Sequence, residues 1–184
     1  MSEPTLLLAP QKPALATARL WSASGFIADP WQTIADDAAL PLAGRAIITL
    51  ARWRQDQAAL LEQGQPIGIA VGSAETIETD TDNIAALTLI ALAFPKFTDG
   101  RAYSTAKRLR EAGYKGELRA TGDVLLDQLP LMLQSGFDTF EITNAATLAA
   151  LDRQPGPIML PSYQRRARPL TAPTTPSAPA LRRA

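Results

Sequence analysis

Cysteine and histidine are both absent from this 184-residue sequence. Without a thiol there is no disulfide, no thiolate nucleophile and no thiolate-held iron–sulfur cluster. Without an imidazole there is no Ser-His-Asp triad and no zinc site of ordinary composition. Any redox step would therefore depend on a bound cofactor, and the sequence does not identify one.

Acidic residues are absent from residues 161–184, which contain five arginines. The formal net charge of the whole chain is zero, so the first 160 residues carry a net charge of −5. This distribution indicates an acidic core followed by a basic tail. We predict no nucleic-acid partner.

Long apolar runs are also absent. No segment approaches the roughly 18 consecutive apolar residues that a membrane span needs. The start, Met1-Ser2-Glu3-Pro4, lacks the basic region of a signal peptide. The sequence therefore predicts a cytoplasmic protein without a membrane partner.

Proline is concentrated at the two ends of the chain, where no sustained apolar period is present. Such segments bury too little apolar surface to offset the entropy of ordering them. We predict a poorly ordered N-terminal segment over 1–20, a single α/β domain over 21–163, and a disordered basic tail rich in Pro, Ala and Arg over 164–184.

Short apolar runs alternate with helix-forming stretches between these ends. Runs such as 67–71 and 89–94 are continuous, as expected of strands covered on both faces, and 103–112 has the composition of a helix. This alternation predicts an α/β fold with a mainly parallel sheet of five to six strands built from βα repeats.

The segment 117–121 differs from the other predicted strands because its side chains alternate in polarity. Glu117, Arg119 and Thr121 would share one face of the strand. A polar face suits a partial (βα) barrel, whereas a doubly wound sheet would have apolar residues on both faces. The sequence leaves both architectures open.

Polar residues follow the predicted strands at the edge where parallel α/β proteins bind ligands. The loop 95–101 is the densest such segment, and we expect it to lie near the end of the next strand. Its cations and the neighbouring carboxylates would then form either a buried network or, as we favour, a site for a small polar ligand. The candidate ligand-binding residues are Lys96, Thr98, Asp99, Arg101, Tyr103, Arg119, Asp123, Asp127 and Gln128.

Structural roles are open for several of these residues. Thr98 or Asp99 could cap the helix after the loop, and Asp123 could cap a helix over 124–134 that also carries Asp127. Pro130 would kink that helix. Two carboxylates are too few ligands for a divalent cation, so we predict no metal site.

Several motifs together resemble the domain-of-unknown-function 934 family. They are Phe94-Pro95-Lys96-Phe97-Thr98-Asp99-Gly100-Arg101, Gly116-Glu117-Leu118-Arg119-Ala120, Gly122-Asp123-Val124-Leu125 and Gly136-Phe137-Asp138. The resemblance covers about residues 29–142. This sequence departs from the family pattern at Ala102, Leu126 and Ser135, where members often have Gly, Arg and Cys. Because Ser135 replaces that cysteine, a thiol mechanism is not open to this chain.

The resemblance implies a place in sulfate assimilation, because members are mostly proteobacterial, are usually encoded beside assimilatory sulfite reductase and are labelled probable oxidoreductases of sulfite reduction. The resemblance does not imply a particular reaction, because none is established for the family. We therefore expect an accessory protein of sulfite reduction that binds sulfite reductase or a small oxyanion such as sulfite. The alternative is an oxidoreductase with a bound flavin or nicotinamide cofactor.

Overall fold

A computed structural model describes residues 18–41 and 43–153. The predictions for residues 1–17 and for the basic tail lie outside these residues. The strands are β1 (Arg19–Ser22), β2 (Gly25–Ile27), β3 (Trp31–Thr33), β4 (Arg45–Thr49), β5 (Ile67–Val71), β6 (Leu89–Phe94), β7 (Glu117–Gly122) and β8 (Thr139–Ile142). The helices are α1 (Leu50–Glu62), α2 (Arg101–Glu111), α3 (Leu129–Ser135) and α4 (Ala145–Arg153), with short 3-10 turns η1 (Ile84–Ala86) and η2 (Leu126–Gln128).

The eight strands form one mixed sheet in the order β2-β1-β8-β7-β6-β5-β4-β3. Strands β3 to β8 run parallel, whereas β1 is antiparallel to both β8 and β2. The predicted sheet of five to six mainly parallel strands is therefore wrong. The hairpin β1–β2 was missed because its strands are only four and three residues long and adjoin a proline-rich segment. The first strand, β1, begins at Arg19, two residues before the start predicted for the α/β domain.

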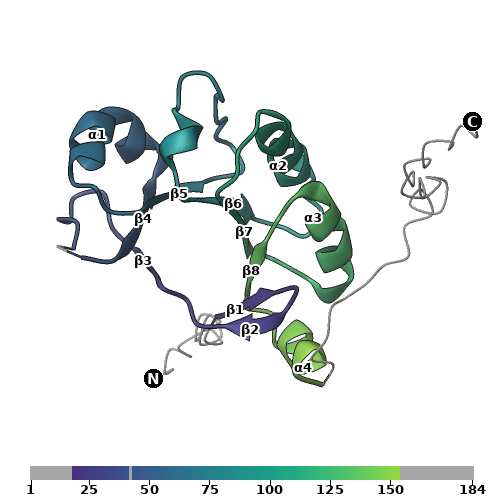
Figure 1. Ribbon diagram of the computed structural model, residues 1–184. Helices are drawn as coiled ribbons and strands as arrows, with labels where there is room; N and C mark the ends of the chain where they lie inside the picture. Colours follow the sequence, from purple (N-terminus) through teal and green to yellow (C-terminus); the bar gives the residue numbers. More distant parts are fainter. Residues whose placement is uncertain (1–17, 42, 154–184) are drawn as a thin grey trace, which may run out of the picture.

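The sheet curls into a half-barrel, and the helices lie on its outer, convex side (Figure 1). A doubly wound sheet would carry helices on both faces, so that alternative is also wrong. Because side chains alternate along a strand, each strand sends one set outward to the helices and the other into the curve.

The main hydrophobic core lies between the convex face of the sheet and the helices. It includes Trp53 of α1, Leu109 of α2 and Phe94 of β6, all with no exposed surface. Trp21 of β1 belongs to the same core and packs on Phe140 of β8, with ring centroids 5.6 Å apart. The β1 hairpin is thus attached to the parallel strands by a buried aromatic pair as well as by the strand ladder.

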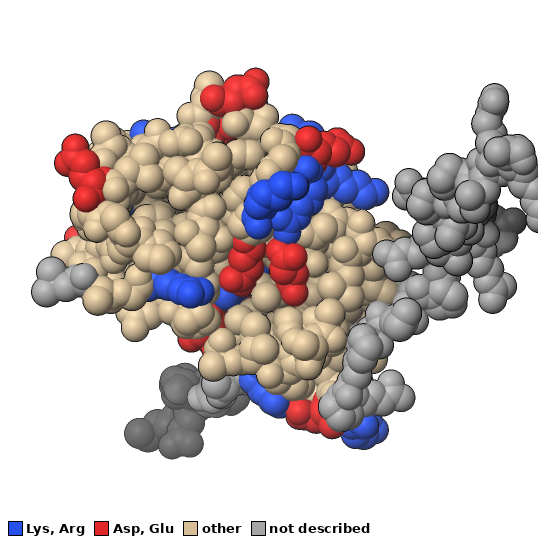
Figure 2. All heavy atoms as spheres, viewed as in Figure 1, with Lys and Arg blue, Asp and Glu red and all other residues tan. Residues whose placement is uncertain are grey.

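A second, smaller apolar cluster lies on the concave face and comprises Trp31, Ile47, Leu89 and Ala91. Trp31 lies close above Gly68 of β5, where an added Cβ would meet the indole ring at 3.1 Å. Glycine at this position therefore gives the ring its space. Acidic and basic side chains gather near the middle of the face seen in Figure 2, which is drawn in the same view as Figure 1.

The expected helix over 124–134 is shorter than predicted. Residues Leu126–Gln128 form the 3-10 turn η2, and α3 begins only at Leu129, with Pro130 in its first turn. Proline is tolerated there because the first amides of a helix have no intrahelical partner. Pro130 therefore starts this helix and does not kink it.

Candidate functional site

The loop 95–101 lies against the segment that follows β7. The Asp123 amide donates to the Phe94 carbonyl over 2.8 Å, and the Phe97 amide donates to the Asp123 carboxylate over 3.0 Å. Gln128 completes the contact, because its side-chain amide donates to the Phe97 carbonyl over 2.6 Å. Asp123 therefore holds the neighbouring loop and is not the cap of a helix that it shares with Asp127.

Asp99 and Arg101 form a local ion pair at the start of α2. The guanidinium donates to both carboxylate oxygens, over 3.0 and 2.7 Å, and the Arg101 amide also donates to Asp99 over 3.1 Å. These hydrogen bonds from Arg101 lower the pKa of Asp99 below its usual value. The expectation that Thr98 or Asp99 caps α2 is wrong, because the N-cap is Gly100 and no side-chain capping hydrogen bond is made there. Asp99 precedes the cap, and its contact with Arg101 orients the Arg101 side chain.

Tyr103 contributes mainly to packing. Its ring meets Phe94 edge-on, with centroids 5.2 Å apart. Burial, and to a smaller extent the Asp127 charge, raises the pKa of Tyr103, so its phenol stays protonated near neutral pH. Lys96 and Thr98 are exposed on the loop, and Asp127 is exposed on η2.

Arg119 does not join these residues. It lies on the concave face with 2 % of its side chain exposed and bonds Asp29 through both terminal nitrogens, over 2.7 and 3.0 Å. It also donates to Glu117 over 3.1 and 3.2 Å, and Glu117 accepts from the Thr139 hydroxyl over 2.6 Å. The predicted grouping of Arg119 with Asp123 and Asp127 is therefore wrong, since its side chain points into the curve of the sheet.

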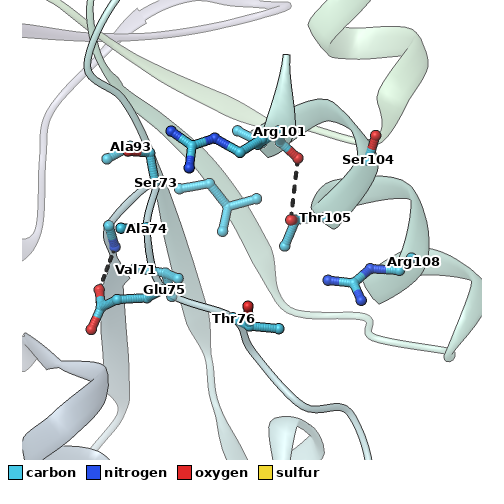
Figure 3. A pocket seen from close by; sticks show the side chains of 13 residues that line it. Val71, Ser73, Ala74, Glu75, Thr76, Ala93, Arg101, Ser104, Thr105 and Arg108 are labelled. Atoms are coloured by element: carbon cyan, nitrogen blue, oxygen red, sulfur yellow. Dashed lines mark hydrogen bonds between the residues drawn. The ribbon is translucent and has the colours of Figure 1, made fainter. Parts of the chain in front are cut away.

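A cavity of about 360 Å³ opens beside the loop, between the segment after β5, the end of β6 and the outer face of α2 (Figure 3). Its polar lining comes from α2 and from the segment after β5, while apolar side chains of β5, β6 and α2 form the rest. The lining residues are Val71, Gly72, Ser73, Ala74, Glu75, Thr76, Leu92, Ala93, Arg101, Ala102, Ser104, Thr105 and Arg108.

Arg101 is thus the one candidate from the sequence that lines this cavity, and Arg108 was missed. The two arginines are seven residues apart on α2, so they share a face two turns apart, about 10 Å along the axis. That spacing was visible in the sequence. Arg108 was overlooked because it lies well inside the helix, away from the strand ends used to choose candidates.

The cavity offers hydrogen-bond donors to a ligand. Ser73 and Ser104 have no side-chain partner within the part of the chain that the structure describes. The Thr105 hydroxyl instead donates to the Arg101 carbonyl over 3.2 Å. Two guanidinium groups with free hydroxyls suit an anion better than a cation. Across residues 18–41 and 43–153, no cluster of three or more Asp or Glu residues could hold a metal ion.

No helix within the described ranges is long and apolar enough to cross a membrane.

The comparisons with known proteins identify a family and no function. No curated protein gives a significant match to this sequence. Residues 68–172, more than half of the chain, match the family model described as "Bacterial protein of unknown function (DUF934)". The resemblance seen in the sequence is thereby confirmed, and the chain belongs to the DUF934 family.

Proposed function

We propose that this protein binds a small oxyanion in the cavity between α2 and the segment after β5, and acts as an accessory protein of assimilatory sulfite reduction. The observation that carries the proposal is the presence of Arg101 and Arg108 on one helix face beside the same cavity. Arginine remains charged at any physiological pH and presents donors in a planar fork that matches oxyanions.

The surroundings of the two arginines support this reading. Arg101 donates to Asp99 through its Nε and one terminal nitrogen. Its other terminal nitrogen has no partner among the described residues. Arg108 forms no ion pair within the described part of the chain. Both guanidinium groups can therefore donate to a ligand without first breaking a buried contact.

The pathway rests on family resemblance rather than on the cavity. The motifs between residues 87 and 142 resemble proteins usually encoded beside assimilatory sulfite reductase, so sulfite is the oxyanion we propose. Sulfite reductase is the proposed partner, and the cytoplasm, where that enzyme's substrate would be met, is the proposed location.

Calorimetric titration of the full-length protein with sulfite tests the binding. Arg108→Gln should weaken sulfite binding by at least about tenfold, because a hydrogen bond to a charged group contributes roughly 1.5–3 kcal/mol. Lys107→Gln is the matched control, since Lys107 is the exposed neighbour on the same helix and does not line the cavity. Equal weakening of sulfite binding by both variants would mean that sulfite is attracted by the overall positive charge of the helix and not by Arg108 at the cavity.

Growth of a deletion strain tests the pathway. Rescue by sulfide but not by sulfite would place the step at sulfite reduction, and complementation should fail with Arg108→Gln but succeed with Lys107→Gln. Equal growth on sulfate, sulfite and sulfide would refute the pathway assignment. A flavin-like absorption band in the purified protein would favour the oxidoreductase alternative instead.

A further inference from the structure

Glu75 is the acidic residue among those that line the cavity. One oxygen of its carboxylate accepts from the Gly72 amide over 2.5 Å, directly after the carboxyl end of β5, and its own amide donates back to the Gly72 carbonyl over 3.0 Å. Its other oxygen has no hydrogen-bond partner among the residues that the structure describes. A site lined by two arginines thus also contains a carboxylate acceptor.

The segment that carries Glu75 is held in place from outside the cavity. Arg54 of α1 donates to the Thr76 carbonyl over 2.8 Å and to both carboxylate oxygens of Asp82 over 2.7 Å. Ile77 is 2 % exposed and packs in the main core. The backbone that carries Glu75 is therefore fixed between a buried side chain and a turn, while the exposed Glu75 carboxylate is held through one oxygen by the Gly72 amide.

We propose that Glu75 makes this cavity selective for oxyanions that carry a proton, such as hydrogen sulfite and hydrogen phosphate, over sulfate. The inference rests on the proposed function, because it assigns a ligand class to the same cavity. An ionised carboxylate only accepts hydrogen bonds. A protonated oxyanion can donate one to Glu75 while the arginines bind its negative oxygens.

Sulfate has no proton to donate near neutral pH, whereas sulfite and phosphate are partly protonated there. Sulfate in the cavity would place an oxygen lone pair against the Glu75 carboxylate, with no hydrogen between two acceptors. Building a repulsive contact against one ligand is a general source of specificity. The Glu75 carboxylate thus lowers the affinity of the cavity for anions in general, but it favours a protonated oxyanion over sulfate.

Titration of the full-length protein with sodium sulfite, sodium phosphate and sodium sulfate, at neutral pH and matched ionic strength, tests the inference. Sulfite and phosphate should bind the wild type at least about tenfold more tightly than sulfate. Glu75→Gln should reduce that ratio to less than about threefold, because the amide can donate to sulfate. Glu78→Gln is the matched control, since Glu78 is exposed in the same segment but does not line the cavity.

The outcomes separate this inference from the proposed function. Equal sulfite and sulfate binding by the wild type, with both lost in Arg108→Gln, would overturn the role of Glu75 and leave the proposed function standing. An equal gain of sulfate binding in Glu75→Gln and Glu78→Gln would also overturn it. Selective binding of phosphate without sulfite would support the role of Glu75 and refute the proposed ligand. Absence of binding by all three ions would refute both.

Discussion

Asp82 shows how one buried carboxylate organises a segment that lacks regular structure. It is 3 % exposed and accepts from Arg54 through both oxygens, and from the Glu78 amide over 2.7 Å. Its carbonyl accepts from the Trp53 indole over 2.7 Å. The hydrogen bonds from Arg54, more than any other contact, lower the pKa of Asp82 below its usual value despite burial.

Asp82 should make the stability of the protein depend on acidity. Because its pKa is lower in the folded chain, its contribution is complete above the unfolded value of 3.8 and is lost as the pH falls through the folded pKa. Asp82→Asn should lower the free energy of unfolding by about 2 kcal/mol at pH 7, less than for a fully buried pair because Arg54 is half exposed.

Urea unfolding at neutral and at strongly acidic pH measures this effect, and the difference between variant and wild type should shrink in acid. Asp152→Asn is the control, since Asp152 and Arg19 form an exposed pair that contributes at most about 1 kcal/mol. An equal loss of unfolding free energy at both pH values would show that Asp82 stabilises the protein through its shape rather than through its charge.

At the scale of elements, the end of β7 depends on glycine. Gly122 has a φ of +93°, and an added Cβ would clash with the Phe94 carbonyl oxygen of the neighbouring strand. That carbonyl also accepts from the Asp123 amide, whose side chain holds the Phe97 amide. The position of loop 95–101 therefore depends on the absence of a side chain at residue 122.

Gly122→Ala should destabilise the protein by about 3 kcal/mol, from the left-handed conformation and the clash together. Gly113→Ala provides the control, because Gly113 has a similar φ of +90° but nothing within 4 Å of an added Cβ. It should lose only about 1 kcal/mol. Thermal or urea unfolding of both variants measures the difference, and equal losses would argue against the contact with Phe94.

Much of the parallel part of the sheet could be predicted because its strands are continuous apolar runs. The segments expected at 67–71 and 89–94 are β5 and β6 with the same bounds. The hairpin β1–β2 could not be predicted, since short strands without a long apolar run look like loop. Its place in the sheet is decided by contacts distant in sequence, such as Trp21 with Phe140.

The candidate site was predictable only where backbone geometry decides it. The rule that neighbouring parallel strands end together placed loop 95–101 beside Asp123 and Gln128. The same rule failed for Arg119, because it locates a residue along a strand but does not say which side chain enters the concave face. Nothing in the sequence indicated that Asp29, 90 residues earlier, would be its partner.

At the scale of the whole molecule, the segment that joins the two edge strands of the sheet is held to the middle of the sheet by side-chain contacts. Strands β2 and β3 lie at opposite ends of the strand order. Asp29, in the segment that joins them, bonds Arg119 of β7 across the concave face and also accepts from the Trp31 amide over 3.0 Å. This ion pair ties the connecting segment to the middle of the sheet.

Arg119→Met should therefore lower the free energy of unfolding by about 3 kcal/mol, because it leaves the carboxylates of Asp29 and Glu117 without their shared cation. Asp29→Asn should cost less, since it retains the shape and leaves Arg119 paired with Glu117. Urea unfolding measures the loss of unfolding free energy in both variants. In these variants the backbone amides of β3 should exchange hydrogen faster than those of β6, which is paired on both sides.

If Arg119 instead served a ligand, Arg119→Met would leave stability near the wild-type value and abolish complementation of the deletion strain. The four donor contacts from Arg119 to two carboxylates favour the structural role.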